Sequence, residues 1–123
     1  METNLISGQI VDAAIKVHTA LGPGLLESAY EACLAHELRK RGLEVERQKE
    51  FPIQYDGQTI DAGYRLDLLV NDAVIVELKA VVEIAPIHHA QIISYLKLGK
   101  KPVGLLINFN VQLLKDGIKR FAN

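Results

Sequence analysis

The sequence predicts a mixed α/β domain in which helices flank one central sheet. Two segments before Gly42 carry apolar side chains at helical spacing. After Gly42 the pattern changes to the alternation and β-branched runs typical of strands, and a third helical segment that begins at Pro86 interrupts those strands. The 123 residues are 49% hydrophobic and 24% charged, which is the size and composition of a single folded domain, 1–123.

Three helices are expected, over residues 4–20, about 25–41 and 86–98. A Gly-Pro-Gly break follows the first helix, and Gly42 and Gly99 are the expected terminators of the other two. The apolar stripe of the second helix includes Cys33, so we expect this side chain in the core.

The expected strand segments are 45–51, 53–55, 59–70, 74–80, 103–108 and 118–121. The first of them is mostly polar, which predicts an exposed strand. The dipeptide Asp56-Gly57 is a hairpin signal. Gly63 is interpreted as a bulge within one strand region over 59–70.

Composition excludes several classes of protein. The net charge of −1 and the pI near 6.4 exclude bulk electrostatic binding of nucleic acid, so such a partner would be attracted locally or through a metal ion. One cysteine excludes an internal disulfide and a four-cysteine zinc site. The N-terminus has no basic head before an apolar stretch, and no apolar run approaches the roughly 20 residues of a membrane helix. We therefore expect a cytoplasmic protein without a membrane partner.

The most informative segment is a predicted hairpin formed by residues 64–70 and 74–80. If its loop is 71–73, side-chain alternation places Asp67 directly opposite Glu77 on one face of the sheet, with Lys79 one pleat further along. The Cβ atoms of opposed residues lie roughly 4.5–5.5 Å apart. Both strands are otherwise strongly apolar, and charged residues without a role are least expected there.

Two interpretations of these charges are open. Close carboxylates repel unless a positive charge lies between them, and Mg²⁺ binds one or two carboxylates together with water and phosphate. In this interpretation Lys79 holds an attacking water or neutralises charge that develops on a phosphate. In the other, Arg65, Asp67, Glu77 and Lys79 are a lattice of cross-strand ion pairs.

An acidic residue on one strand followed by Glu-x-Lys on the next resembles the signature of the PD-(D/E)xK nuclease superfamily, although Leu66 replaces its proline. The stretch Gly24-Leu25-Leu26-Glu27-Ser28-Ala29-Tyr30 is similar to the defining motif of the GxxExxY proteins, which are small prokaryotic members of that superfamily. Segments 89–97 and 114–120 also resemble the GxxExxY family, so the resemblance covers nearly the whole chain. It implies a restriction-endonuclease-like core.

The resemblance also implies a catalytic centre. Asp67, Glu77 and Lys79 would be the catalytic residues. Glu27 would join Asp67 and Glu77 as a ligand of Mg²⁺ or Mn²⁺. Without the resemblance, Glu27 is equally an acidic residue favoured by the positive end of a helix dipole.

Three further residues are implied as substrate contacts. Gln91 and Tyr95 match the Gln-x-x-x-Tyr motif of RecB-like members, and Tyr30 lies one turn after Glu27. Taken alone, the two tyrosines would be aromatic residues at the core edge, and Gln91 would be ordinary surface.

The sequence thus predicts a metal-dependent nuclease that hydrolyses phosphodiester bonds, with DNA as the expected substrate. A domain this small suggests either a homodimer or a larger protein partner. The main alternative is a non-catalytic module that retains the fold and binds nucleic acid or protein. A hydrolase acting on sugars or nucleotides is a weaker third alternative.

Overall fold

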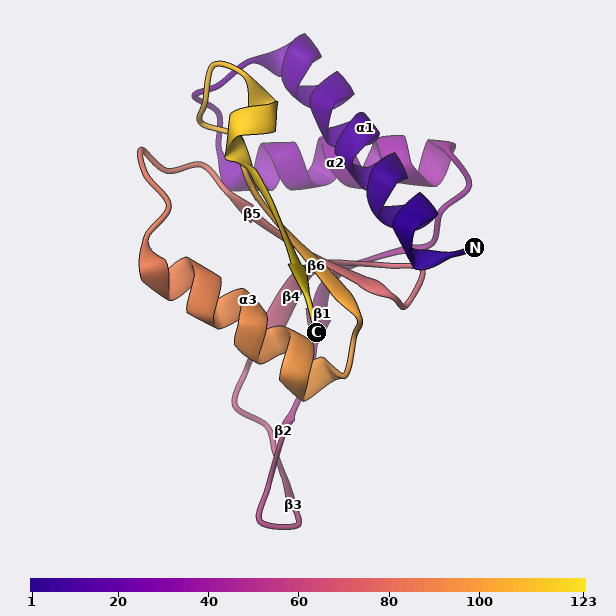
Figure 1. The fold of residues 1–123 in the computed structure, drawn as a ribbon, viewed down its shortest axis with the longest axis vertical. Helices are drawn as coiled ribbons and strands as arrows, with labels where there is room; N and C mark the ends of the chain where they lie inside the picture. Colours follow the sequence, from indigo (N-terminus) through magenta and orange to yellow (C-terminus); the bar gives the residue numbers. More distant parts are fainter.

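The computed structural model covers residues 1–123. Helices α1 (Thr3–Leu21) and α2 (Glu27–Lys40) cover one face of a five-stranded sheet, and α3 (Pro86–Gly99) packs on the other (Figure 1). No helix is both long and apolar enough to cross a membrane.

The central sheet has the strand order β1-β4-β5-β6-β7. Its strands are β1 (Val45–Glu50), β4 (Arg65–Val70), β5 (Val74–Lys79), β6 (Val103–Asn108) and β7 (Ile118–Ala122). Only β5 and β6 pair in parallel, and α3 connects them, as a parallel connection requires. The other three pairings are antiparallel. The predicted mixed α/β fold with a flanked central sheet is therefore confirmed.

The two faces of β5 are buried in different cores. Val74, Val76 and Leu78 pack with α1 and α2, whereas Ile75 packs with Tyr95 and other residues of the α3 side. Because β5 is central and covered on both faces, every residue of the strand before its last one, Lys79, is buried. Glu77 is one of these residues.

The predicted single strand over 59–70 is wrong, because two separate strands, β3 (Gln58–Ile60) and β4, lie in this region. Strand β3 pairs with β2 (Ile53–Tyr55) in a hairpin of their own, which projects from the body of the protein (Figure 1). Gly63 has a φ of 74° and lies in the loop before β4, so it breaks the strand instead of bulging it.

Two details of the helices also differ from the prediction. Helix α3 includes Gly99, and its left-handed cap residue is Lys100, with a φ of 53°. Cys33 is exposed, because the buried side of α2 is formed by Tyr30, Leu34 and Leu38.

Gly104 allows α3 to approach the sheet closely. A Cβ atom at this position of β6 would lie 3.0 and 3.1 Å from two carbons of Ile92 and 3.2 Å from Leu96, both on α3. These distances are shorter than comfortable van der Waals contact, and protein cores resist such overpacking. The glycine therefore helps to fix how near α3, with Gln91 and Tyr95, lies to β5 and β6.

We expect Gly104→Ala to lower the free energy of unfolding by about 1–3 kcal/mol, because the added methyl group pushes against α3. Urea titration measures this loss. Gly8→Ala is the matched control: its Cβ meets nothing within 4 Å in α1, so the substitution should stabilise the protein by about 0.5–1 kcal/mol. Equal stability of the two variants would contradict the close packing of α3.

Candidate active site

The site begins where β4 and β5 separate. Leu69 faces Ile75 and Leu68 faces Val76, so the register places Asp67 opposite Glu77, as predicted from a loop of residues 71–73. Beyond Leu68 the two backbones are no longer paired. Instead, Oδ2 of Asp67 accepts a hydrogen bond of 2.8 Å from the backbone N–H of Leu78. The carboxylate thus takes the place of a strand–strand hydrogen bond.

Glu77 is a buried acid without a full set of partners. Only 4% of the residue is exposed, and its Oε1 atom has no hydrogen-bond partner. Burial, reinforced by the neighbouring Asp67 carboxylate, raises the pKa of Glu77 to about 10. The side chain is therefore protonated at neutral pH unless a positive charge joins it.

The ion-pair lattice considered for these strands is not present. Arg65 pairs with Glu50 on β1, at 3.3 Å between Nη2 and Oε1. Asp67, Glu77 and Lys79 take part in no ion pair within 4.0 Å. The interpretation of the charges as cross-strand salt bridges is therefore wrong for Asp67 and Glu77.

Lys79 lies half-buried at the end of β5. Its carbonyl accepts a hydrogen bond of 2.8 Å from the N–H of Phe109, and the ammonium group opposes the rise in the pKa of Glu77. The following turn is held by Asn108, whose side chain bonds both the N–H and the carbonyl of Val81. These contacts fix the strand end from which Lys79 projects.

Helix α3 brings Tyr95 against the sheet close to the carboxylate pair. Tyr95 is 6% exposed and packs with Leu69 and Ile75, which lie two residues from Asp67 and Glu77 respectively. Burial, with a contribution from the charge of Glu77, raises the pKa of the Tyr95 hydroxyl, and the Gln91 side chain acts in the opposite direction. Tyr95 is thus beside the carboxylate pair, and Gln91 lies one helical turn before Tyr95 on α3.

Two residues that were not predicted from the sequence, Gln48 and Glu31, contact this site. Gln48 lies in β1 between the residues that pair with Leu68 and Leu66, and it has a φ of 50°, which few non-glycine residues adopt. Its Nε2 donates to Oε1 of Glu31 at 2.6 Å and to Oδ1 of Asp67 at 3.4 Å, so these two oxygens lie no more than 6.0 Å apart. Glu31 is also held by Arg47 at 3.1 Å. No sequence signal marked Gln48, whereas Glu31 could have been found as the acid one turn after Glu27.

The structure places the two predicted residues at the start of α2 apart from the carboxylate pair. Glu27 is exposed and lines a shallow hollow that Ala80 also lines. Tyr30 is fully buried, stacks on Phe109 at 4.4 Å and donates its hydroxyl hydrogen to the Gly22 carbonyl at 2.6 Å. The predicted contact of Tyr30 with a substrate is therefore wrong, because its side chain is buried and supports the loop between α1 and α2.

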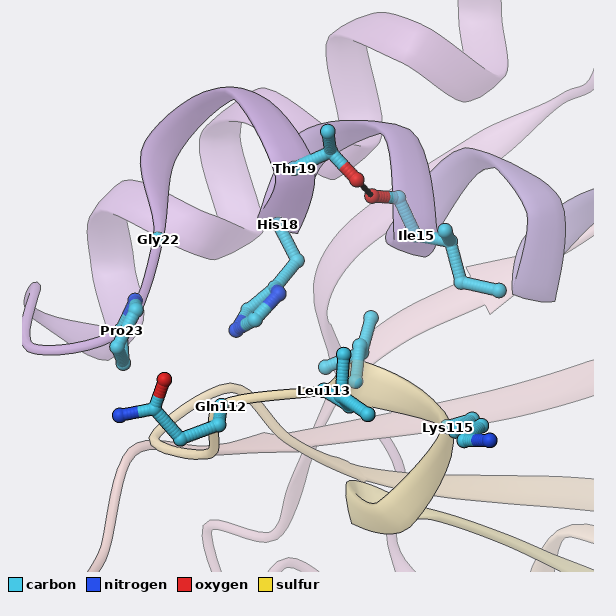
Figure 2. A pocket seen from close by; sticks show the side chains of 9 residues that line it. Ile15, His18, Thr19, Gly22, Pro23, Gln112, Leu113 and Lys115 are labelled. Carbon is cyan, nitrogen blue, oxygen red and sulfur yellow. Dashed lines mark hydrogen bonds between the residues drawn. The ribbon is translucent and has the colours of Figure 1, made fainter.

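A cavity of about 450 Å³ lies away from these carboxylates, between the end of α1 and the chain around Leu114 (Figure 2). His18 points into it and donates from Nε2 to the Val111 carbonyl at 2.8 Å. No Asp or Glu lines this cavity. It therefore lacks the carboxylates that a sugar hydrolase would need.

Side chains of His, Cys, Asp and Glu form no group of three that is already placed to hold a metal ion. The donor chemistry of the pair nevertheless fits a divalent cation: two opposed carboxylates are oxygen ligands, and the free Oε1 of Glu77 lacks a partner. A cation would satisfy that atom and remove the repulsion between Asp67 and Glu77. The complete ligand set stays a prediction.

Comparison with known proteins identifies the family. The family model of the PD-(D/E)XK nuclease superfamily matches residues 4–121. The chain belongs to the PD-(D/E)XK nuclease superfamily. In this member of the superfamily, Asp67 and the Glu77-Leu78-Lys79 segment occupy β4 and β5. No curated protein and no solved structure matched the chain.

We expect Glu77→Gln to stabilise the metal-free protein. The folded-state pKa of Glu77, about 10, lies above its usual 4.5, so the wild type loses stability as the pH rises between these values. Between pH 4.5 and pH 7 this titration lowers the free energy of unfolding of the wild type by at most about 3 kcal/mol. Glutamine does not titrate, so the variant should escape this loss.

Thermal melts in EDTA from pH 5 to pH 9 measure the effect, with Glu83→Gln, an exposed site without hydrogen-bond or ion-pair contacts, as the control. The gap between wild type and Glu77→Gln should widen with pH. A constant gap would show that Glu77 is not protonated in the folded state.

Proposed function

We propose that the protein is a metal-dependent nuclease that hydrolyses phosphodiester bonds, with DNA as its substrate, and that it is a member of the GxxExxY group of the superfamily. The observation that carries the proposal is the unpartnered carboxylate oxygen of Glu77 beside Asp67 on two central strands. An unsatisfied buried acid is costly to the folded state, and such acids are concentrated at functional sites.

Asp67 and Glu77 would hold Mg²⁺ or Mn²⁺, and the third acid would come from α2, either Glu27 as predicted or Glu31. The bound cation supplies positive charge that polarises a phosphate ester. Asp67 is already oriented for this role, because the Leu78 N–H holds one of its oxygens and Gln48 approaches the other. Glu77 would release its proton on metal binding, so affinity should increase with pH.

Lys79 would act on the substrate side of the same strand. Its ammonium group donates hydrogen bonds and carries a positive charge, so it can orient the attacking water and stabilise charge on the phosphate oxygens. In the reaction a bond forms between the water oxygen and phosphorus, and one ester P–O bond breaks. Gln91 and Tyr95 would position the strand from α3.

A non-catalytic module is the alternative outcome of the test. The near-neutral charge of the chain supports neither function over the other. The absence of ion pairs around Asp67 and Glu77 favours the nuclease, because a module that did not use these acids would gain from pairing or replacing them.

We expect Lys79→Ala and Glu77→Ala each to reduce cleavage by roughly 100-fold or more, because each removes a charged group from the reacting centre. Cleavage of single-stranded DNA, duplex DNA and RNA is measured at low salt with Mg²⁺ or Mn²⁺. Lys79→Ala should keep the wild-type fold by circular dichroism. Lys115→Ala, an exposed lysine outside the site, should cleave like the wild type.

No cleavage by the wild type on any of these substrates would favour the non-catalytic module. Cleavage that persists in Lys79→Ala would show that Lys79 is not part of the reacting centre.

We expect Glu31→Gln to weaken Mn²⁺ binding about 10-fold or more, because Glu31 fixes Gln48 against Asp67. Glu27→Gln should have a smaller effect, because that side chain is exposed at the helix start. Titration calorimetry with Mn²⁺ measures both. The opposite order would make Glu27 the principal acid of α2 at the metal site.

A further inference from the structure

Three aromatic side chains form a cluster beside the candidate active site. We call Phe51, Tyr64 and Tyr95 the aromatic cluster. The ring centroids are 5.1 Å apart for Phe51 and Tyr95, 5.9 Å for Phe51 and Tyr64, and 6.0 Å for Tyr64 and Tyr95. All three spacings lie in the range at which aromatic rings interact favourably.

The cluster combines segments that are distant in the sequence. Phe51 follows β1, Tyr64 precedes β4, and Tyr95 is on α3. The N–H of Phe51 donates to the carbonyl of Tyr64 at 3.1 Å, which joins the two segments at the base of the projecting β2–β3 hairpin. The backbone segments that carry Phe51 and Tyr64 are therefore hydrogen-bonded to each other, and neither ring lies at the tip of a loop.

The cluster is open to solvent at one ring. Tyr95 is only 6% exposed, Phe51 is half-buried, and Tyr64 is 40% exposed. A closed satellite core would shield all three rings. Here the buried rings support a third ring that remains accessible, which is the arrangement of a stacking platform.

The platform lies next to the carboxylate pair. Tyr95 packs in one cluster with Leu69 and Ile75, which lie two residues from Asp67 and Glu77 respectively. Tyr64 is three residues before Asp67 and directly precedes the strand that carries it. A nucleotide base seated on Tyr64 would therefore place neighbouring phosphates close to the carboxylates.

We propose that the aromatic cluster binds an unpaired nucleobase through Tyr64, and that the protein accordingly prefers single-stranded over duplex nucleic acid. This inference rests on the proposed nuclease function but concerns binding alone. The physical reason is access: in a duplex each base is stacked between its neighbours, whereas a single strand presents its base faces to an aromatic ring.

Charge makes this contact more important here than in a basic protein. The chain has a net charge of −1, so phosphate attraction alone provides little affinity. Stacking on an aromatic ring is worth about 1–3 kcal/mol per base and is tolerant of sequence. A preference for unpaired bases without strong sequence specificity follows.

The experiment measures binding by fluorescence anisotropy in EDTA at low salt, so that no metal-dependent cleavage occurs. The probes are a fluorescein-labelled 20-nucleotide oligo(dT), its duplex with oligo(dA), and an abasic strand with the same number of phosphates. We expect oligo(dT) to bind at least about five-fold more tightly than the other two.

Variants at Tyr64 separate stacking from simple apolar contact. Tyr64→Phe should bind oligo(dT) like the wild type, because the ring remains. Tyr64→Leu should lose about five-fold or more in affinity for oligo(dT) and lose no affinity for the abasic strand. Tyr55→Leu is the matched control, since Tyr55 is 69% exposed on the β2–β3 hairpin, away from the aromatic cluster. Melting temperatures verify that each variant is folded.

Equal affinity of the wild type for oligo(dT), duplex and abasic strand would overturn the inference. So would a Tyr64→Leu variant that binds oligo(dT) as tightly as the wild type does, or a wild type that binds none of the probes. The result is independent of catalysis. A Tyr64-dependent preference for oligo(dT) in a protein that cleaves nothing would support this inference while refuting the nuclease.

Discussion

The candidate site depends on the hydrogen bond from the Leu78 N–H to the Asp67 carboxylate. Backbone pairing of β4 and β5 ends at Leu68 and Val76, and the side chain of Asp67 then satisfies an N–H group that would otherwise be left unpaired inside the sheet. One interaction therefore ends the strand pairing and orients an acid.

The buried position of Glu77 follows from the topology. Strand β5 is third of five in the sheet, with α1 and α2 on one face and α3 on the other, so its side chains are covered on both sides (Figure 1). A carboxyl group in this environment is favoured in its neutral form, and the nearby acid strengthens that preference. The fold thus holds a buried carboxyl group whose pKa lies well above its usual range.

The surroundings of the pair are built from several elements. Strand β1 contributes Gln48, α2 contributes Glu31, and α3 contributes Tyr95. Their positions depend on packing: Gly104 allows α3 to lie close to the sheet, and Arg47 holds Glu31 toward β1. A rigid frame of this kind keeps functional groups in place without a bound ligand.

The sequence by itself determined the three helices, most of the strands and the register of the β4–β5 hairpin, because periodicity and turn residues are local signals. That register was enough to place Asp67 opposite Glu77. Only the tertiary structure decided that Tyr30 is core, that Gln48 bridges Glu31 and Asp67, and that Glu77 has an unpartnered oxygen. Burial and contacts between distant segments depend on how helices pack over a sheet, and no local sequence pattern encodes that packing.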